Sequence, residues 1–337
     1  MYSVYLNLLL TGWAYYSYKE SQYNKTDTTQ YFPKSGVFDL VSPALQKLSQ
    51  QLLKWRQQSA PTVQTVREGL DNMSTISIPD DVKVEVVDAG GVPAEWITAS
   101  GVVQKNIILH YHGGGFIAGS VKNSRDFLGR LSRATKARVL SVEYRLAPEH
   151  PYPAAVDDTF TAYKWLLSTK VFPKYVIIIG ESAGGNLAMV TLLKARDAKI
   201  PLPVAGILIS PYLDIWQADG TYLTKALEDT FLSPEAFALF KTSYIGTSDK
   251  QHNPEVSPIY GDLRGLPPLF LQVGTAEMLL DNSTRFAEKA RNAGIKVELD
   301  IIEGGIHTMA LWPPMIPEAA QCLNNIVKFI NPFFNTI

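Results

Sequence analysis

The sequence lacks most of the features that mark secreted, nucleic-acid-binding and metal-dependent proteins. Its 337 residues contain one cysteine, Cys322, so no intrachain disulfide can form and nothing indicates an oxidising compartment. The formal net charge is −1 and no block of five like charges occurs, which removes the electrostatic reason to expect a nucleic acid or an anionic membrane as partner. Cys322 lies in an apolar helical pattern and is predicted to be a buried thiol.

Motifs for metals and nucleotides are missing as well. There is no H-E-x-x-H, no C-x-x-C and no phosphate-binding G-x-x-x-x-G-K-[ST] loop, and the glycine run at 113–115 does not have the spacing of G-x-G-x-x-G. We therefore expect no metal, no cofactor and no nucleic-acid partner.

Long apolar runs are scarce, and the candidate for one is at the N-terminus. Residues 1–18 carry no charge, but they lack the basic start and the cleavage site of a signal peptide. Asn7, Thr11 and Gly12 interrupt the run before it reaches the ~20 apolar residues that a membrane span needs. We interpret this segment as an amphipathic helix and expect a cytoplasmic protein. Membrane contact through residues 1–18, or secretion, is the alternative.

From about residue 80 onward, short β-type runs alternate with helical patterns. The central runs are continuous and rich in Val, Ile and Leu, as strands buried on both faces should be. This alternation predicts an α/β fold with a mainly parallel sheet. The expected strands are 82–87, 106–111, 138–142, 175–180, 205–210, 269–273 and 296–302, with helices at 126–135, 155–167, 186–196 and 285–293.

Two regions break this alternation. Residues 1–60 are helical and aromatic, and residues 212–250 read as helix around FLSPEAFALFKTSYI. We predict that both contribute to a helical cap over the carboxyl edge of the sheet, where open α/β sheets bind ligands. The catalytic α/β domain would then consist of two parts, residues 61–211 and residues 251–337.

The clearest chemical motif is Gly180-Glu181-Ser182-Ala183-Gly184. This G-x-S-x-G follows a strong predicted strand and precedes a predicted helix, which is the context of a nucleophile elbow. The sharp turn exposes the serine oxygen at a helix N-terminus, where partial positive charge favours an anion. Ser182 is therefore predicted to be a catalytic nucleophile rather than a simple helix cap.

A serine nucleophile needs a histidine base and a carboxylate, which in this architecture follow it in the order serine, acid, histidine. Two of the five histidines follow Ser182: His252 in a polar loop, and His307 on a glycine loop after a predicted strand. We assign His307 as base. Glu277 is the preferred acid because it lies in the first loop after its strand, with Asp281 as runner-up and Asp214 as a further candidate.

The segment HYHGGGF, residues 110–116, follows another predicted strand. Its three glycines leave backbone N–H groups accessible, and with the N–H of Ala183 they can form an oxyanion hole. His112 is expected to orient this loop without transferring a proton. Trp216 and Phe231 are candidates for the substrate pocket, although packing in the core is an equal alternative for each.

These elements together resemble the hormone-sensitive-lipase family of α/β-hydrolases. The resemblance begins at about residue 80 and rests on HGGGF, GESAGG, YRLAPEHPYPAA (144–155), SPYLD (210–214) and LPPLFLQVGTAEMLLDNS (266–283). It implies an α/β-hydrolase fold, with an eight-stranded mostly parallel sheet, helices on both faces and a helical cap. It also implies Ser182 as nucleophile, His307 as base, and Gly113, Gly114 and Ala183 as oxyanion donors, with Gly115 also in register.

Two positions depart from the pattern of many members. Glu277 stands where that pattern has aspartate, and glutamate is one methylene longer, which keeps Asp281 open as the acid. Glu181 also replaces an aspartate, and we expect it to be structural and paired with Arg145.

The resemblance implies a carboxylesterase that hydrolyses short- to medium-chain esters through an acyl-enzyme, without a cofactor. Its expected partner is a small-molecule ester, and the oligomeric state is left open. The alternatives are an amidase, formamidase or steryl-acetate hydrolase with the same triad. A ligand receptor without activity is disfavoured, because serine, acid and histidine are all present.

Overall fold

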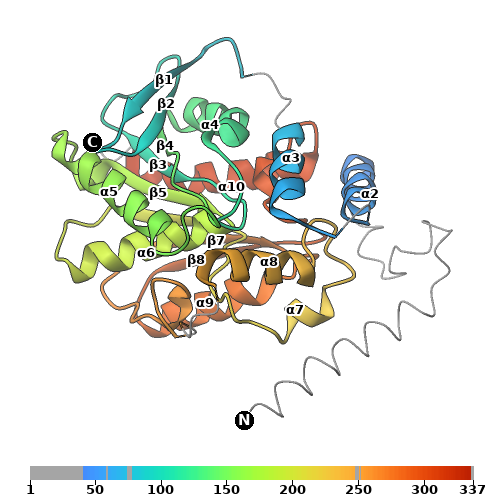
Figure 1. Cartoon of the computed structure of the whole chain (residues 1–337). Coiled ribbons are helices and arrows are strands. Elements are labelled where there is room, and N and C mark those ends of the chain that lie inside the picture. Colours follow the sequence, from blue (N-terminus) through green and yellow to red (C-terminus); the bar gives the residue numbers. More distant parts are fainter. Residues whose placement is uncertain (1–40, 58–59, 74–77, 247–249, 251, 335–337) are drawn as a thin grey trace, which may run out of the picture. The chain divides into compact units, whose positions relative to one another are not determined.

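The computed structural model describes residues 41–57, 60–73, 78–246, 250 and 252–334 (Figure 1). The helix predicted for residues 1–18, and most of the predicted cap segment 1–60, lie outside the described residues. No helix in the described ranges is both long and apolar enough to cross a membrane.

Eight strands form one sheet in the order β1-β2-β4-β3-β5-β6-β7-β8 (Figure 1). β2 runs antiparallel to both β1 and β4, and all other neighbours are parallel. The predicted eight-stranded, mostly parallel sheet is confirmed. The strands are β1 Val82–Asp88, β2 Pro93–Ala99, β3 Ile107–Tyr111, β4 Arg138–Val142, β5 Val176–Glu181, β6 Ala205–Ile209, β7 Leu269–Gly274 and β8 Val297–Ile302.

Helices cover both faces of the sheet, as predicted. In β5, Ile178 belongs to the hydrophobic cluster formed with α5, α6 and α9, whereas Ile177 and Ile179 belong to the cluster formed with α4 and α10. Successive side chains of a strand point to opposite faces of the sheet, so one apolar run packs against the helices on both faces. The helices are α2 Pro43–Gln57, α3 Val63–Met73, α4 Val121–Thr135, α5 Ala154–Ser168, α6 Ala183–Asp197, α7 Thr221–Thr224, α8 Pro234–Ile245, α9 Leu280–Asn292 and α10 Pro317–Phe334, with 3-10 turns η3 Pro173–Tyr175, η4 Pro258–Tyr260 and η5 Met309–Leu311.

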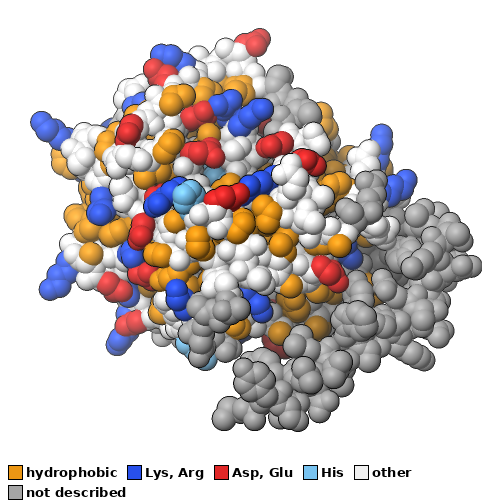
Figure 2. Space-filling model, in the orientation of Figure 1, with side chains coloured by type: hydrophobic (Ala, Val, Ile, Leu, Met, Phe, Trp, Pro, Cys, Tyr) orange, Lys and Arg blue, Asp and Glu red, His pale blue; other side chains and the backbone are white. Residues whose placement is uncertain are grey.

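The parallel strands explain why distant motifs meet. β3, β5, β7 and β8 run in the same direction, so the loops that follow them leave the sheet at one edge. Those loops carry the glycine run, Ser182, Glu277 and His307. Acidic and basic side chains are interspersed over the face drawn in Figure 2, so no single sign of charge dominates that face.

Candidate active site

Ser182 occupies a strained turn between β5 and α6. Its φ of 53° and ψ of −118° lie in a region that residues other than glycine rarely adopt. Backbone hydrogen bonds hold the turn: the N–H of Ser182 donates to Ile209 O at 2.9 Å, and its carbonyl accepts from Tyr212 at 3.0 Å. The turn therefore has the predicted nucleophile-elbow geometry, with the serine directly before the first turn of α6.

The glycines beside Ser182 are required by close backbone contacts. A Cβ on Gly180 would lie 2.2 Å from Gly184 O, and a Cβ on Gly184 would lie 2.0 Å from Tyr111 O. Both distances are far below van der Waals contact, and backbone atoms cannot rotate away. The elbow and the end of β3 are thus packed directly against each other.

Gly184→Ala is expected to destabilise the fold by at least ~2 kcal/mol, because the new methyl group overpacks a rigid backbone contact. Urea unfolding of parent and variant measures this. Gly129→Ala in α4 is the matched control, since its Cβ would meet nothing closer than the Val82 side chain at 3.2 Å. Equal stability of Gly184→Ala and the parent would contradict the close approach.

The structure brings His307 and Glu277 together. His307 Nδ1 lies 2.8 Å from Glu277 Oε2, and the Glu277 side chain is fully buried. The other carboxylate oxygen accepts from Ser210 Oγ at 2.7 Å and from the N–H of Gly274 at 2.6 Å. Because an ionised carboxylate only accepts, Nδ1 carries the proton and Nε2 is left as the acceptor that a base requires.

Ser210 was not predicted as a site residue, although it begins the SPYLD motif. Its hydroxyl donates to Glu277 and accepts from the N–H of Thr308 at 3.0 Å. One side chain at the end of β6 therefore joins the carboxylate to the backbone that follows His307.

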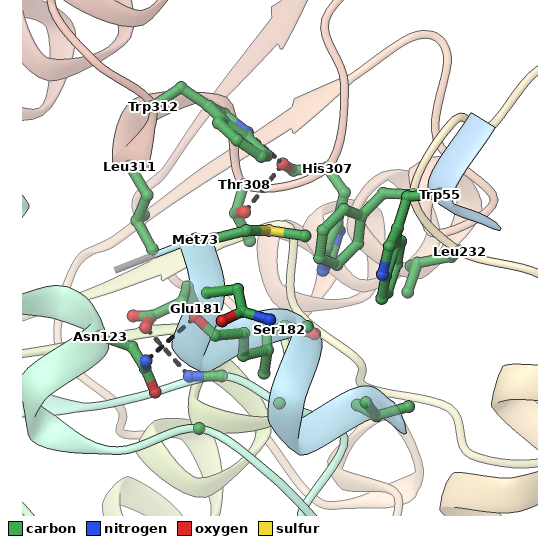
Figure 3. A pocket seen from close by; sticks show the side chains of 18 of the residues that line it. Trp55, Met73, Asn123, Glu181, Ser182, Leu232, His307, Thr308, Leu311 and Trp312 are labelled. Carbon is green, nitrogen blue, oxygen red and sulfur yellow. Dashed lines mark hydrogen bonds between the residues drawn. The ribbon is translucent and has the colours of Figure 1, made fainter. Parts of the chain in front are cut away.

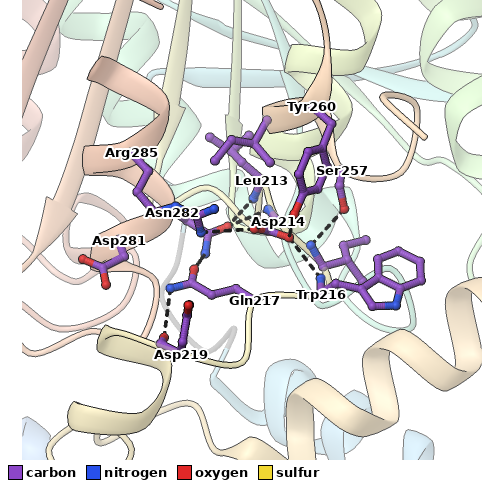
Figure 4. A network of polar contacts seen from close by, with 12 residues as sticks. Leu213, Asp214, Trp216, Gln217, Asp219, Ser257, Tyr260, Asp281, Asn282 and Arg285 are labelled. Carbon is purple, nitrogen blue, oxygen red and sulfur yellow. Dashed lines mark hydrogen bonds and ion pairs between the residues drawn. The ribbon is translucent and has the colours of Figure 1, made fainter. Parts of the chain in front are cut away.

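The two other acids have different partners. Asp281 Oδ2 accepts from the N–H of Thr221 at 2.7 Å, and its own N–H donates to Thr221 Oγ1 at 3.0 Å. Asp214 lies in the polar network of Figure 4, where it contacts Tyr260 and pairs with Arg285 at 3.1 Å. Neither carboxylate has a hydrogen bond to His307 among the described residues.

The glycine loop faces the elbow, but its first N–H is already used. The N–H of Gly113 donates to Glu181 Oε1 at 2.9 Å, which conflicts with its predicted role as an oxyanion donor. Within the described residues, no acceptor is bonded to the N–H groups of Gly114, Gly115 and Ala183. These three donors are therefore available to a ligand beside Ser182.

Glu181 is structural, as expected, but its predicted partner was wrong. Arg145 pairs with Asp158 at 2.7 Å, whereas Glu181 Oε2 lies 2.8 Å from His110 Nε2. Burial acts to raise the pKa of Glu181, but His110 and the N–H of Gly113 outweigh it and hold the pKa below its usual range. An ionised carboxylate next to the elbow thus fixes the start of the glycine loop.

His112 is held in the position expected of a loop-orienting residue. Its ring stacks on Tyr144 with centroids 4.1 Å apart, and its Nδ1 lies 2.8 Å from Gly113 O. Burial lowers the pKa of His112 to about 4, so the ring is neutral near neutral pH and Nδ1 donates to the carbonyl.

The lowered pKa of His112 predicts a loss of stability in acid. The unfolded chain, with an ordinary histidine, takes up this proton at a higher pH than the fold does, so stability falls between about pH 6.5 and pH 4. The contribution lost by pH 4.5 is on the order of 2 to 3 kcal/mol. Urea unfolding at pH 7.5 and pH 4.5 should show a smaller difference for His112→Gln than for the parent. Parallel pH dependence of the two proteins would contradict a neutral His112.

Ser182 and His307 line the same cavity, which has a volume of about 890 Å³ (Figure 3). Helices α2 and α3, the glycine loop, the start of α4 and the segment around Phe231 form its walls. The ring of Phe231 stacks on His307 with centroids 5.6 Å apart. Trp216 is not among the described residues that line the cavity; its backbone N–H donates to Asp214 Oδ1 at 3.2 Å.

Two further predictions concern Cys322 and metal ligands. Cys322 is buried as predicted, and burial raises the pKa of its thiol. No group of three or more His, Cys, Asp or Glu residues that could hold a metal ion occurs in the parts of the chain that the structure describes.

Comparison with known proteins gives consistent results. A family model described as alpha/beta hydrolase fold matches residues 108–311. An esterase of Acinetobacter venetianus RAG-1 is 38% identical over 248 residues, which are 74% of this chain and 82% of that protein. An acetyl-hydrolase of Streptomyces hygroscopicus is 34% identical over 246 residues, which are 73% of this chain and 82% of that protein. The crystal structure of an esterase from the bacterial hormone-sensitive lipase family has a TM-score of 0.84 and 34% identity, covering 87% of this chain and 99% of that chain.

Proposed function

The chain belongs to the hormone-sensitive-lipase family of α/β-hydrolases and is a carboxylic ester hydrolase. We propose that it cleaves short- to medium-chain esters through an acyl-enzyme on Ser182. The observation that carries the proposal is the 2.8 Å hydrogen bond between the buried Glu277 and His307, which lines the same cavity as Ser182. This arrangement supplies a nucleophile, a base of fixed tautomer and a carboxylate to stabilise the imidazolium.

The first half-reaction forms the acyl-enzyme. His307 Nε2 takes the hydroxyl proton as Ser182 Oγ attacks the ester carbonyl, and Glu277 stabilises the resulting imidazolium. The carbonyl oxygen becomes an oxyanion that accepts from the N–H groups of Gly114, Gly115 and Ala183. We choose Gly114 and Gly115 because the N–H of Gly113 is held by Glu181. As the tetrahedral intermediate collapses, His307 protonates the alkoxide and the alcohol leaves.

The second half-reaction releases the acid. A water molecule gives a proton to His307 and attacks the acyl carbonyl on Ser182, and the oxyanion occupies the same N–H donors. The bond to Ser182 Oγ then breaks, His307 returns the proton to that oxygen, and the carboxylic acid departs. His307 accepts and then returns each proton that is transferred, so the proposed cycle needs no cofactor.

The cavity supports a substrate of limited size. A volume of about 890 Å³ lies within the range of pockets that enclose drug-sized ligands. The segments that close it over Ser182 are α2, α3 and part of the 212–250 insertion, which we propose act together as the cap. Phe231 then forms a wall beside the reacting ester. The apolar side chains of the wall include Leu48, Trp55, Val66, Met73, Phe127, Phe231, Leu232, Phe240, Leu311 and Trp312.

The proposal is tested by kcat/KM for p-nitrophenyl esters from acetate to palmitate, with p-nitroanilides of the same acids beside them. We expect a maximum at a short or medium chain, and anilides cleaved far more slowly than esters. A maximum at palmitate would contradict the size limit, and faster anilide cleavage would favour an amidase.

Activity should also depend on pH through the base. His307 acts as base only when Nε2 is unprotonated, so kcat/KM should decrease as the pH is lowered and this nitrogen takes up a proton. A rate measurement from pH 4 to pH 8 with p-nitrophenyl butyrate checks this. A flat profile down to pH 4, in a range where the protein is still folded, would contradict a histidine base.

A further inference from the structure

Besides Glu277 and Glu181, another buried carboxylate lies close to the proposed site and has no part in the mechanism above. Asp229 is 1% exposed and lies between α7 and α8. Its Oδ1 accepts from the N–H groups of Phe231 at 2.9 Å and Leu232 at 2.8 Å, and its Oδ2 accepts from the N–H of Met278 at 2.9 Å. Burying a carboxylate is costly unless hydrogen bonds compensate for the lost water. These three bonds show which backbone segments the carboxylate of Asp229 holds in place.

The three donors belong to two parts of the site. Phe231 and Leu232 line the cavity, and the ring of Phe231 stacks on His307 with an interplanar angle of 29°. Met278 directly follows Glu277 in the loop after β7. One carboxylate therefore connects the wall beside the histidine to the loop that carries its acid.

The same segment is also held by α2. The Arg56 guanidinium donates to the carbonyl oxygens of Ala226 at 3.2 Å and Leu232 at 2.8 Å, and also to that of Asp229. Trp55, the preceding residue, approaches Phe231 with ring centroids 6.0 Å apart. The segment that contains Asp229 is thus hydrogen-bonded both to α2, which lines the cavity, and to the loop after β7, which carries Glu277.

Charge supports a role beyond packing. Burial raises the pKa of Asp229, while His307 and the N–H groups of Leu232 and Met278 act in the opposite direction. A negative charge that interacts with His307 favours the imidazolium, and the imidazolium forms only as the reaction proceeds.

We propose that Asp229 is a positioning residue of the active site, which holds Phe231 and the loop after Glu277 in place around His307. This rests on the proposed serine mechanism, because it assigns Asp229 to the setting of the histidine base. Loss of the carboxylate should affect the transition state more than the bound ester, so kcat should change and KM should not.

Asp229→Asn is the direct test, because asparagine keeps an acceptor for Phe231 and Leu232 but removes the charge and presents an amide N–H₂ to Met278. We expect kcat for p-nitrophenyl butyrate to fall about 10- to 100-fold with KM within about threefold of the parent. The matched control is Asp214→Asn. Asp214 is also buried and accepts the N–H of Trp216, but it has no bond to the described residues around His307.

The kinetics of these variants decide the inference. A kcat within twofold of the parent for a folded Asp229→Asn overturns it, and so does an equal loss in Asp214→Asn, which would indicate a structural role only. If Asp229→Asn does not fold, Phe231→Leu decides instead: a loss of kcat at unchanged KM supports the inference, and an unchanged kcat overturns it. Titration of the parent with a p-nitrophenyl phosphonate distinguishes failure of this inference from failure of the proposed mechanism. A parent that is not labelled on Ser182 overturns the proposed function itself.

Discussion

Replacing Ser182 with alanine is expected to lower kcat for p-nitrophenyl butyrate on the order of 10⁶-fold, as when the nucleophile of a serine hydrolase is removed. The hydroxyl oxygen is the atom that would bond the acyl group, and nothing else at the elbow replaces it. Alanine has the same Cβ as serine, so the strained φ of 53° costs it no more, and the fold should persist. Initial rates at high enzyme concentration, with urea unfolding alongside, measure both effects.

The control for this change is Ser257→Ala. Ser257 is fully buried, its hydroxyl accepts the N–H of Ile215 at 3.0 Å, and it is not among the described residues that line the cavity. Its loss should reduce stability modestly while kcat stays within about threefold. Retention of more than about a hundredth of the parent activity in Ser182→Ala would contradict Ser182 as nucleophile.

Glu277→Gln should lower kcat by about 10⁴-fold, for a reason that the hydrogen bonds make specific. Ser210 and the N–H of Gly274 both donate to Glu277 Oε1, so the amide oxygen of glutamine takes that place. Its N–H₂ group then faces His307 Nδ1, which must accept. The proton of the neutral imidazole moves to Nε2, and the base can no longer take the hydroxyl proton of Ser182.

Asp281→Asn is the matched control, because it removes the charge of the runner-up acid, which lies four residues after Glu277 in the first turn of α9. Its carboxylate is bonded to Thr221, and asparagine keeps an oxygen that can accept that N–H. We expect kcat within about threefold of the parent, since the bond is remote from His307. Steady-state kinetics on both variants decides the assignment, and the reverse ranking would place the acid at Asp281.

Strand order made much of the site predictable. Ser182, Glu277 and His307 each follow a segment that the sequence predicts as a strand, and the ends of parallel strands share one edge of the sheet. The same reasoning missed β2, whose sequence PAEWITA begins with proline and includes two alanines that favour strands weakly. Pairing with β1 and β4 forms this strand, and the local sequence does not reveal that pairing.

Hydrogen-bond partners were less predictable than positions. Gly113, Gly114 and Gly115 are equivalent in the sequence, and only the folded contact with Glu181 shows that the first N–H is occupied. Glu181 itself was paired with Arg145 because opposite charges attract, but a buried histidine on β3 lies closer. Asp229 gave no signal, because a buried acid in a polar-looking loop is indistinguishable from an exposed one until the tertiary structure is known.

The central claim is that the acyl group of the ester is transferred to Ser182, and mass spectrometry after reaction with a p-nitrophenyl alkylphosphonate tests it most directly. Attack by Ser182 Oγ on phosphorus forms a stable adduct and releases one p-nitrophenolate per active chain. We predict one phosphonyl group per chain, located on the peptide that contains Ser182, with loss of esterase activity in step and no labelling of Ser182→Ala. Labelling on another residue, or full esterase activity in a chain labelled on Ser182, would contradict the account.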